Sequence, residues 1–451
     1  MHPFRFRKDS VMKPVVAIVG RPNVGKSTLF NAIAEDQISI VQDTPGVTRD
    51  RIYADATWLN TTFTMIDTGG IEPDSGDLIL SKMREQAEIA IATADVIVFI
   101  VDVRQGLQDA DGKVADMLRR SGKPVVLCVN KVDNFEKQMA EVYEFYQLGI
   151  GDPVPVSAIS KKGIGDLLEA VAAHFPAETG EAEPDDTPKI AIIGKPNAGK
   201  SSLLNKLAGE DRMIVSEVAG TTRDAVDTTV RHDHKDYIFI DTAGLRRKSK
   251  IREEIERYSI IRAVTAVERA DVVILLIDGA EGVTEQDAKI AGIAHERGKG
   301  VLIAVNKWDL VEKDDKTIYR FTENVRKTLS FMPYAEILFI SAKTGQRIGR
   351  IYEVLDMILA NQAMRVGTGV LNEIIADALV MQQPPSDKGR RLKVFYATQV
   401  GVKPPVFVIF VNDRELMHFS YVRYLENRIR EAFGFRGTPL KFVIRERGEK
   451  A

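Results

Sequence analysis

The chain has 451 residues, enough for about three domains at roughly 150 residues each. With 44% hydrophobic and 28% charged residues, its composition is that of a globular protein and excludes a disordered, collagen-like or disulfide-scaffold chain. Lys and Arg number 62 against 64 Asp and Glu, so a uniformly basic nucleic-acid coat protein is excluded, whereas a locally basic domain is not.

The beginning of the chain and its apolar runs carry no membrane or export signal. Residues 1–12 are interpreted as a basic N-terminal extension, and the apolar run that follows is too short for a secretory signal. No apolar run reaches the length of about 18 residues that a membrane helix needs. The single cysteine, Cys128, cannot form an internal disulfide, which fits a reducing compartment. We therefore expect a cytoplasmic protein without stable membrane insertion.

A repeat defines the organisation of the chain. Five short motifs occur twice in the same order, with an offset of 174 residues for the first three, 176 for the fourth and 184 for the fifth. They are G-x-P-N-x-G-K-S at 20–27 and 194–201, T-R-D at 48–50 and 222–224, D-T-[GA]-G at 67–70 and 241–244, N-K-x-D at 130–133 and 306–309, and S-A at 157–158 and 341–342. Conserved order and near-constant spacing within one chain indicate a duplicated domain.

Each copy alternates short apolar runs with helical segments, which predicts an open α/β sheet whose site lies beyond the carboxyl ends of its strands. Continuous apolar runs such as 96–101 and 125–129 are typical of parallel strands buried on both faces. Residues 177–188 contain five acids, no bases and two prolines, the composition of a solvated linker. We predict a first domain over 13–176, this acidic flexible linker over 177–188, a second domain over 189–360 and a C-terminal domain over 361–451.

The first repeated motif is a phosphate-binding loop. Its glycines let backbone N–H groups turn toward phosphates, and the N-terminus of the following helix adds positive potential. Lys26 and Lys200 are expected to reach the β- and γ-phosphates, while Ser27 and Ser201 are expected to ligate Mg²⁺. The predicted nucleotide-binding residues of the loops are Gly20, Asn23, Gly25, Lys26, Ser27 and Thr28, and Gly194, Asn197, Gly199, Lys200, Ser201 and Ser202.

The N-K-x-D motif identifies the base. A carboxylate can accept two hydrogen bonds from the N1–H and N2–H₂ edge of guanine, and adenine offers no such pair of donors, so Asp133 and Asp309 are the predicted discriminating residues. The alternative, an ordinary surface turn, is disfavoured because the motif follows a phosphate-binding loop twice at matching spacing. The other residues predicted to bind the base are Asn130, Lys131, Ser157 and Ala158, and Asn306, Lys307, Ser341 and Ala342.

Between these motifs lie residues expected to respond to the third phosphate. Thr48 and Thr222 are predicted to close on Mg²⁺ and the γ-phosphate, with an ordinary Thr-rich loop as the alternative. Asp67 and Asp241 are predicted to hold the metal, and Gly70 and Gly244 to offer a backbone N–H to the γ-phosphate. The predicted catalytic set is Lys26, Lys200, Thr48, Thr222, Gly70 and Gly244, and the predicted Mg²⁺ set is Ser27, Thr48, Asp67, Ser201, Thr222 and Asp241.

The C-terminal segment is unlike the repeats. From Arg365 to the end it carries 15 Lys and Arg against 9 Asp and Glu. Its pattern predicts a helix near 370–379, strands near 392–399 and 406–411, a helix near 421–433 and a last strand near 441–445. This order makes a small α+β domain with one three-stranded sheet.

Two tandem motif sets followed by a small basic domain resemble the Der (EngA) family of bacterial GTPases with two Era-like domains, from about residue 13 to the end. The resemblance implies an α/β fold with two P-loop GTPase (Ras-like) domains in tandem and a C-terminal KH-like domain. It implies hydrolysis of GTP to GDP and phosphate with Mg²⁺, and a role in assembling the large ribosomal subunit, with its rRNA as partner. We expect a monomer whose two GTP sites act as switches, with a regulatory protein as a further candidate partner.

The source of catalytic charge needs a separate explanation. A Ras-like GTPase has a water-orienting glutamine after D-T-x-G, whereas this chain has Ile71 and Leu245. Hydrolysis is therefore expected to be slow alone and to be stimulated by K⁺ or by the ribosome. Asn23 and Asn197 occupy the loop position that ligates K⁺ in the similar TrmE- and Era-like GTPases. The alternative is that each asparagine only stabilises its loop by local hydrogen bonds.

Two basic regions allow more than one interpretation. Five of the eight residues at 245–252 are basic, which fits either a solvated face or a switch that contacts RNA or another domain. The G-x-x-G at 434–437 follows a predicted helix and precedes the last strand, so we interpret it as a helix end and turn rather than an RNA-gripping loop. The tail is expected to contact rRNA, and the alternative is a structural domain packed between the GTPase domains. The basic residues considered for this contact are Arg390, Arg391, Lys393, Arg423, Arg428 and Arg430.

Two other functions compete with this one: the GTPase motor of an RNA-modification process and a membrane-associated GTPase. The first, in the related TrmE, uses a folate-binding region and a reactive C-terminal cysteine, whereas the one cysteine here is Cys128. The second predicts an apolar hairpin or an amphipathic anchor, and the sequence contains neither. His232 and His234 could form a metal pair, but an exposed hairpin is the favoured interpretation.

Overall fold

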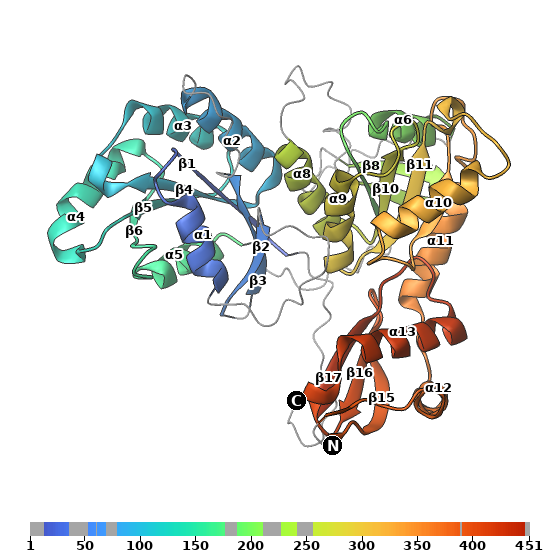
Figure 1. Ribbon diagram of the computed structural model, residues 1–451. Helices are drawn as coiled ribbons and strands as arrows, with labels where there is room; N and C mark the ends of the chain where they lie inside the picture. Colours follow the sequence, from blue (N-terminus) through green and yellow to red (C-terminus); the bar gives the residue numbers. More distant parts are fainter. Residues whose placement is uncertain are drawn as a thin grey trace. The chain divides into compact units, whose positions relative to one another are not determined.

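The structure is a computed structural model that describes residues 13–35, 53–59, 61–68, 79–175, 187–210, 227–240, 256–387 and 390–446 (Figure 1). Within these ranges the chain divides into two compact units. The first comprises the described residues up to 175 together with 256–268, and the second comprises those from 187 to 240 and from 269 onwards. The first unit holds one six-stranded sheet, and the second holds another six-stranded sheet, a two-stranded ribbon and a three-stranded sheet.

The first sheet has the strand order β2-β3-β1-β4-β5-β6, and all neighbours are parallel except β2 and β3. The predicted apolar strands become β4 and β5, which lie in the middle of the sheet and need apolar residues on both faces. The elements in chain order are β1 (Val15–Gly20), α1 (Lys26–Glu35), β2 (Tyr53–Trp58), β3 (Thr61–Asp67), α2 (Ile79–Thr93), β4 (Val96–Asp102), α3 (Asp109–Arg120), β5 (Val125–Asn130), α4 (Phe135–Tyr143), β6 (Val154–Pro155) and α5 (Ile164–Ala172).

Helices cover both faces of this sheet. Ala87 of α2 and Leu118 of α3 are fully buried in the core of one face, and Ile33 of α1 and Leu167 of α5 lie in the core of the other. Cys128 of β5 belongs to the second core, where burial raises the pKa of its thiol. It is therefore a buried structural residue, as its place in an apolar strand predicted.

The second sheet repeats the topology of the first, which confirms the predicted duplication. Its order is β12-β11-β10-β7-β9-β8, and only β8 and β9 are antiparallel. The β8–β9 hairpin turns at Asp233 and His234, and the ring of His232 stacks on Tyr352 at 4.0 Å, which confirms the hairpin interpretation. In chain order the elements are β7 (Lys189–Ile193), α6 (Lys200–Glu210), β8 (Thr228–His232), β9 (Lys235–Phe239), α8 (Glu256–Arg269), β10 (Val272–Asp278), α9 (Glu285–Glu296), β11 (Gly300–Asn306), α10 (Thr317–Thr328), β12 (Glu336–Phe339) and α11 (Arg350–Ala363), of which α8 up to residue 268 belongs to the first unit.

The C-terminal domain has the predicted α-β-β-α-β order. Its sheet runs β15-β16-β17, with β15 antiparallel and β17 parallel to β16. Leu371, Ile409 and Leu425 are fully buried between the sheet and the helices. The elements are α12 (Thr368–Met381), β15 (Val394–Gly401), β16 (Val406–Val411), α13 (Phe419–Phe433) and β17 (Lys441–Glu446), and the sequence did not predict the short ribbon of β13 (Ser386–Asp387) and β14 (Arg390–Arg391).

The G-x-x-G segment ends α13 and docks the C-terminal domain on the second six-stranded sheet. Gly434 caps the helix, which confirms the predicted helix end and turn. Gly437 accepts a hydrogen bond from Val301 N (2.7 Å) and donates one to Tyr334 O (2.8 Å). A Cβ on Gly437 would lie 2.3 Å from Ile358 Cγ1, so this close approach requires glycine.

A charged and aromatic cluster completes the same interface. Arg436 makes two hydrogen bonds of 2.7 Å with the carboxylate of Glu336. The Nδ1 atom of His295 lies 2.9 Å from the hydroxyl of Tyr334, and the guanidinium of Arg430 lies 5.0 Å from the centre of the Tyr334 ring. Burial, together with the nearby positive charges of Arg430 and Lys441, lowers the pKa of His295 to about 4. This histidine is therefore neutral at pH 7.

Candidate functional site

The first phosphate-binding loop connects β1 to α1. Gly25 has a φ of +100°, and a Cβ there would lie 2.3 Å from Asn130 Nδ2, so both the turn and the close approach require glycine. Asn23 has a left-handed φ of 64°, which asparagine tolerates better than most residues. Lys26, the first residue of α1, donates from Nζ to two carbonyl oxygens of the loop, at 2.9 and 2.7 Å. The loop thus holds an ammonium group at its own mouth.

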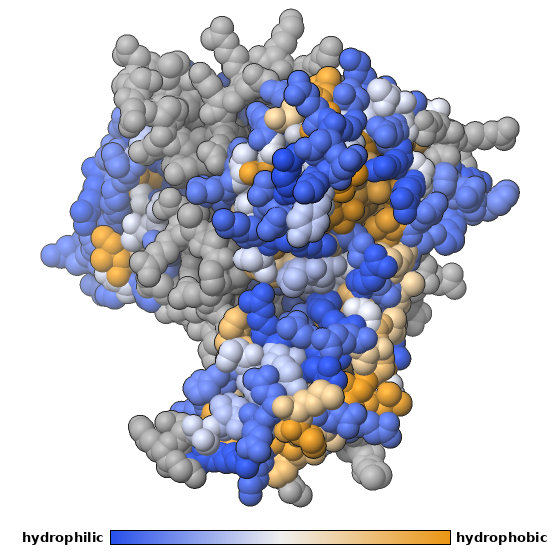
Figure 2. Space-filling model, turned by 45° about the vertical axis from the view of Figure 1, so that its right-hand side comes forward, coloured by the Kyte–Doolittle hydropathy of each residue, from blue (hydrophilic) through white to orange (hydrophobic). Residues whose placement is uncertain are grey.

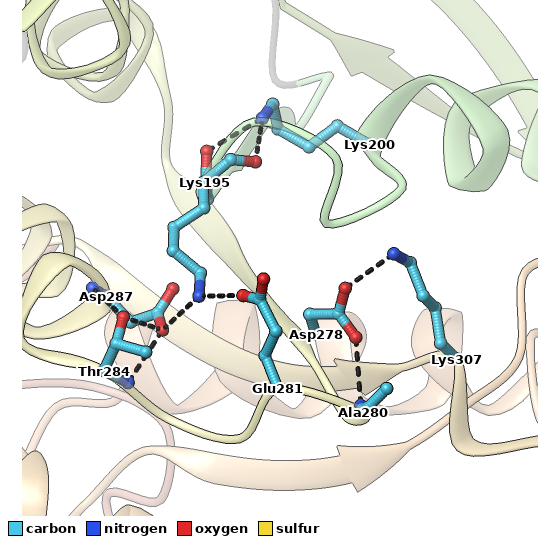
Figure 3. Close-up of polar contacts among 9 residues, drawn as sticks. Lys195, Lys200, Asp278, Ala280, Glu281, Thr284, Asp287 and Lys307 are labelled. Atoms are coloured by element: carbon cyan, nitrogen blue, oxygen red, sulfur yellow. Dashed lines mark hydrogen bonds and ion pairs between the residues drawn. The ribbon is translucent and has the colours of Figure 1, made fainter. Parts of the chain in front are cut away.

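The second loop has the same geometry. Gly199 has a φ of +97°, and its Cβ would lie 2.3 Å from Asn306 Nδ2. Asn197 has a φ of 62°. Lys200 donates to the carbonyl oxygens of Gly194 and Lys195 at 2.8 and 2.6 Å (Figure 3). Because two segments of different sequence fold alike, the geometry is a property of the shared motif residues.

The N-K-x-D asparagine connects three loops of each site. Asn130 donates from Nδ2 to Val24 O (2.9 Å) in the phosphate-binding loop and accepts at Oδ1 from Ala158 N (3.0 Å) in the S-A loop. In the second copy, the corresponding bonds of Asn306 to Ala198 O and from Ala342 N are both 2.9 Å long. Both asparagines are 2% exposed. One buried amide therefore fixes the phosphate loop relative to the base-recognition loops.

The N-K-x-D lysines are held by aspartates that the motif analysis missed. Lys131 Nζ donates to Asp102 Oδ2 and Lys307 Nζ to Asp278 Oδ2, both at 2.6 Å (Figure 3). Burial opposes the charge of Asp278, but hydrogen bonds from Lys307 and from the backbone outweigh it and hold the pKa of this carboxyl below its usual value. Each aspartate ends a central strand, and the pair shares the 176-residue offset of N-K-x-D. That offset is the signal that could have found them.

The predicted metal ligands of the first copy lie together. Ser27 Oγ donates to Asp67 Oδ2 at 2.7 Å, at the point where α1 begins and β3 ends. The next residue, Thr68, donates to Ile18 O at 2.5 Å and fixes the end of β3 against β1. A hydroxyl and a carboxylate at this separation form a pair of hard oxygen donors, which fits Mg²⁺.

A second missed feature is a buried ion pair under each phosphate-binding loop. In the first copy, Arg21 Nε donates to Asp111 Oδ1 at 2.8 Å and Arg21 Nη1 donates to Gln105 Oε1 at 2.7 Å. Asp111 is fully buried, and burial raises its pKa even though Arg21 acts in the opposite direction. We refer to this set of contacts as the loop brace; in the first copy it consists of Arg21, Gln105 and Asp111.

The loop brace of the second copy consists of Lys195, Glu281 and Asp287. Lys195 Nζ lies 2.5 Å from Glu281 and 3.6 Å from the fully buried Asp287, which also accepts from Thr284 N at 2.9 Å (Figure 3). Burial opposes the charge of Lys195, but the two carboxylates outweigh it and raise the pKa of the ammonium. Glu281 is 63% exposed, whereas Asp287 is fully buried, so the contact with Asp287 anchors Lys195 inside the protein. The brace therefore fixes the second residue of the loop.

The two base-recognition carboxylates have different surroundings. Hydrogen bonds from Arg104 and Ser157 hold the pKa of Asp133 below its usual value. A hydrogen bond from Ser341 does the same for Asp309. Asp309 Oδ1 is nonetheless a buried acceptor without a hydrogen-bond partner among the described residues. An unpaired buried acceptor of this kind suits an N–H donor of a ligand.

Some predicted site residues lie outside the described residues, and their roles stay predictions. They are Thr48, Gly70, Thr222, Asp241 and Gly244, with Ile71, Leu245 and the basic run at 245–252. Thr28 and Ser202 are described and are exposed at the starts of α1 and α6.

The candidate basic residues of the tail divide into two groups. Four contact other protein groups: Arg390 pairs with Asp413, Arg428 with Glu431 and Arg430 with Glu426, while Arg423 reaches Ser330 O. Arg391 and Lys393 are exposed, and no ion pair of their side chains occurs within the described residues. The surface view shows mostly hydrophilic side chains, with hydrophobic patches on the C-terminal domain at the bottom (Figure 2).

No described helix is long and apolar enough to cross a membrane. No group of three or more His, Cys, Asp or Glu side chains that could hold a metal ion occurs in the same ranges.

Comparison with known proteins agrees with this picture. A family model described as "50S ribosome-binding GTPase" matches residues 15–131 and 189–307, and one described as "KH-domain-like of EngA bacterial GTPase enzymes, C-terminal" matches 365–445. Proteins named GTPase Der from Agathobacter rectalis and Lachnoclostridium phytofermentans are 72% and 71% identical, each over 97% of this chain and 99% of the relative. Among solved structures, Era in complex with MgGDPNP and nucleotides of 16S ribosomal RNA matches at 22% identity and a TM-score of 0.30, over 58% of this chain and 93% of that one.

Proposed function

Because the chain belongs to the GTPase Der family, we propose that its two GTP sites act as switches of an assembly factor for the large ribosomal subunit. The observation that carries this proposal is the duplicated site, in which the phosphate loop, the N-K-x-D loop and the S-A loop are tied together twice by one buried asparagine. The description of the matching family model as a 50S ribosome-binding GTPase supports the choice of partner.

The chain is a GTPase, and the proposed chemistry is in-line attack of water on the γ-phosphorus with loss of GDP. Lys26 and Lys200 would exchange their carbonyl partners for phosphate oxygens and neutralise the charge that develops there. Asp133 and Asp309 would accept the guanine N1–H and N2–H₂ donors. Thr48, Thr222, Gly70 and Gly244 are proposed to close on the γ-phosphate.

Ser27 and Asp67 would hold Mg²⁺ in the first site, since their oxygen atoms already meet. Thr48 is proposed as the third ligand, and Ser201, Thr222 and Asp241 as the corresponding set in the second site. When bound, Mg²⁺ reduces the negative charge on the β- and γ-phosphate oxygens.

We propose K⁺ as a further cofactor, held by Asn23 and Asn197. Both residues lie on the exposed side of their loops in a left-handed conformation, which positions them without a change of backbone. Turnover at equal ionic strength should be faster in K⁺ than in Na⁺, and Asn23→Ala together with Asn197→Ala should remove the difference. Equal turnover of the unaltered protein in the two salts would rule out this role.

The proposed rRNA contact is best supported at Arg391 and Lys393, because four of the other basic candidates already contact protein groups. Each phosphate contact adds nearly one unit to the slope of log affinity against log salt. Arg391→Ala with Lys393→Ala should therefore lower that slope by nearly two units, whereas Arg428→Ala should leave it nearly unchanged.

Co-sedimentation with purified large ribosomal subunits tests the main proposal. The protein would be compared with a non-hydrolysable GTP analogue, with GDP and without nucleotide, at controlled salt. Binding that requires the analogue is expected of a switch. Absence of binding in every state, with GTP affinity intact, would refute the ribosomal assignment. A ribosomal partner would place the protein in the cytoplasm. A monomer with domains at 13–176, 189–360 and 361–451 is the proposed arrangement, with a linker at 177–188 that lies mostly outside the described residues.

A further inference from the structure

The two copies share the N-K-x-D motif but differ in what its aspartate contacts. In the first copy, Asp133 Oδ1 accepts from Ser157 Oγ at 2.9 Å, and Asp133 Oδ2 forms an ion pair with Arg104 Nη2. In the second copy, Asp309 Oδ1 is buried and has no hydrogen-bond partner within the described ranges. The residue that corresponds to Arg104 at the 176-residue offset is Ala280. Both oxygens of Asp133 thus have a partner, whereas Oδ1 of Asp309 has none among the described residues.

Arg104 reaches Asp133 from a position whose backbone N–H contact recurs in the second copy. It is the middle residue of the 3-10 helix η2 (Val103–Gln105), and its N–H donates to Asp102 Oδ1 at 3.0 Å. In the second copy, Ala280 N donates to Asp278 Oδ1 at 2.9 Å. The hydrogen bond to the strand-terminal aspartate is thus shared, although residues 103–105 form a 3-10 helix and residues 279–281 form a turn. Ala280 is exposed, so a longer side chain fits there.

Guanine and arginine compete for the same acceptor. The guanidinium group presents paired N–H donors to a carboxylate, and the N1–H and N2–H₂ edge of guanine does so as well. Arg104 already occupies Oδ2, one of the two oxygens that guanine would use. We propose that Arg104 is a competitor of the guanine base at the first site and that it makes this site bind guanine nucleotides more weakly than the second. This inference rests on the proposed role of Asp133 and Asp309 as guanine acceptors, and it is independent of the ribosomal partner.

The size of the effect follows from exposure. The side chains of Arg104 and Asp133 are 59% and 47% exposed. Exposed ion pairs change an equilibrium constant by a factor of about 1.5 to 5. Apparent affinity falls by the fraction of molecules in which the acceptor is free, so the first site loses at most this factor. Because salt screens exposed pairs, the loss should shrink as the ionic strength rises.

Equilibrium titration of the full-length protein with a fluorescent GDP analogue tests this inference. Asp309→Asn removes the second acceptor, so that the first site is observed alone. In that background, Arg104→Ala should tighten binding about two- to fivefold at low salt, and the gain should fall at high salt. Arg119→Ala removes an exposed arginine that is paired with Asp116 on α3, and it should change nothing. Weaker or unaltered binding by Arg104→Ala would overturn the inference.

The reverse exchange provides a second test. In an Asp133→Asn background, Ala280→Arg with Glu281→Gln recreates the Arg104–Gln105 pair in the second site. This change should weaken binding there by a similar factor relative to Glu281→Gln alone, and unaltered binding would contradict the competition. If Asp133→Asn and Asp309→Asn themselves fail to weaken guanine binding, the acceptor assignment is wrong and the inference falls with it. Failure of Arg104→Ala alone leaves the acceptor assignment standing.

Discussion

Asn306→Asp isolates the role of the buried amide, because it replaces one NH₂ group by an oxygen of nearly the same size. The acceptor that receives Ala342 N is retained, whereas the donor to Ala198 O is lost and a second oxygen faces that carbonyl. At 2% exposure, water cannot replace the missing donor. Leaving a buried carbonyl unpaired costs about 1–3 kcal/mol. This corresponds to a loss of about 5- to 150-fold in GDP affinity at the second site.

The range is an upper bound because part of the penalty is already present in the nucleotide-free protein. Titration with a fluorescent GDP analogue in an Asp133→Asn background measures the loss of GDP affinity at the second site. Burial raises the pKa of a carboxyl placed at this position, and its protonated form restores a donor, so the defect should lessen as the pH falls. Asn130→Asp in the first copy, measured with Asp309→Asn, should reproduce the loss. Affinity within about twofold of the parent at neutral pH would show that the amide does not position the loops.

Three further changes give expected outcomes in other parts of the protein. Lys200→Ala should slow phosphate release from the second site by about 10²–10³-fold, and Lys26→Ala combined with it should abolish release, since each site loses the ammonium that meets the phosphates. The lowered pKa of His295, about 4 against an ordinary 6.5, means that the unfolded chain takes up a proton first as the pH falls. Stability should therefore decrease from pH 6.5 toward 4, and His295→Gln should reduce the drop in thermal midpoint between about pH 7.5 and about pH 5. Gly437→Ala should destabilise the second unit by about 2–5 kcal/mol in denaturant titration, because Gly437 has a positive φ and its Cβ would clash with Ile358. Gly434→Ala, whose Cβ meets open space, should cost only about 1–2 kcal/mol. Equal losses for the two variants would contradict the docking role of the turn.

The repeat made most of the fold predictable. Motifs such as G-x-P-N-x-G-K-S predict a strand end, a turn and a helix start within eight residues, and continuous apolar runs are typical of central parallel strands. The order of the C-terminal elements followed from their apolar runs and from the Pro-Pro pairs at 384–385 and 404–405, which separate them. Each of these signals lies within a short stretch of sequence, so it can be recognised without knowledge of the rest of the fold.

Contacts between distant side chains were not predictable in this way. The loop brace joins Arg21 to Asp111 and Lys195 to Asp287, and each residue alone looks like an ordinary surface charge in the sequence. Only a comparison of the two copies at their fixed offsets would have marked them. The docking of Gly437 on Val301 had no counterpart in the other copy, so the repeat could not indicate it. Two of the three predicted catalytic residues of each site, the threonine and the glycine, lie outside the described residues and remain predictions.

Strand β11 contacts the C-terminal domain near its start and the loops of the second site at its end. Near its start, Val301 is bonded to the turn of the C-terminal domain, and its last residue is Asn306, which ties the loops of the second site together. Seven fully buried residues at about 3.3 Å each form a stiff rod about 20 Å long. A force on the C-terminal domain would reach the base-recognition loop along this one strand, because no loop separates Val301 from Asn306. A displacement of that domain would therefore act on the second nucleotide site through this one strand.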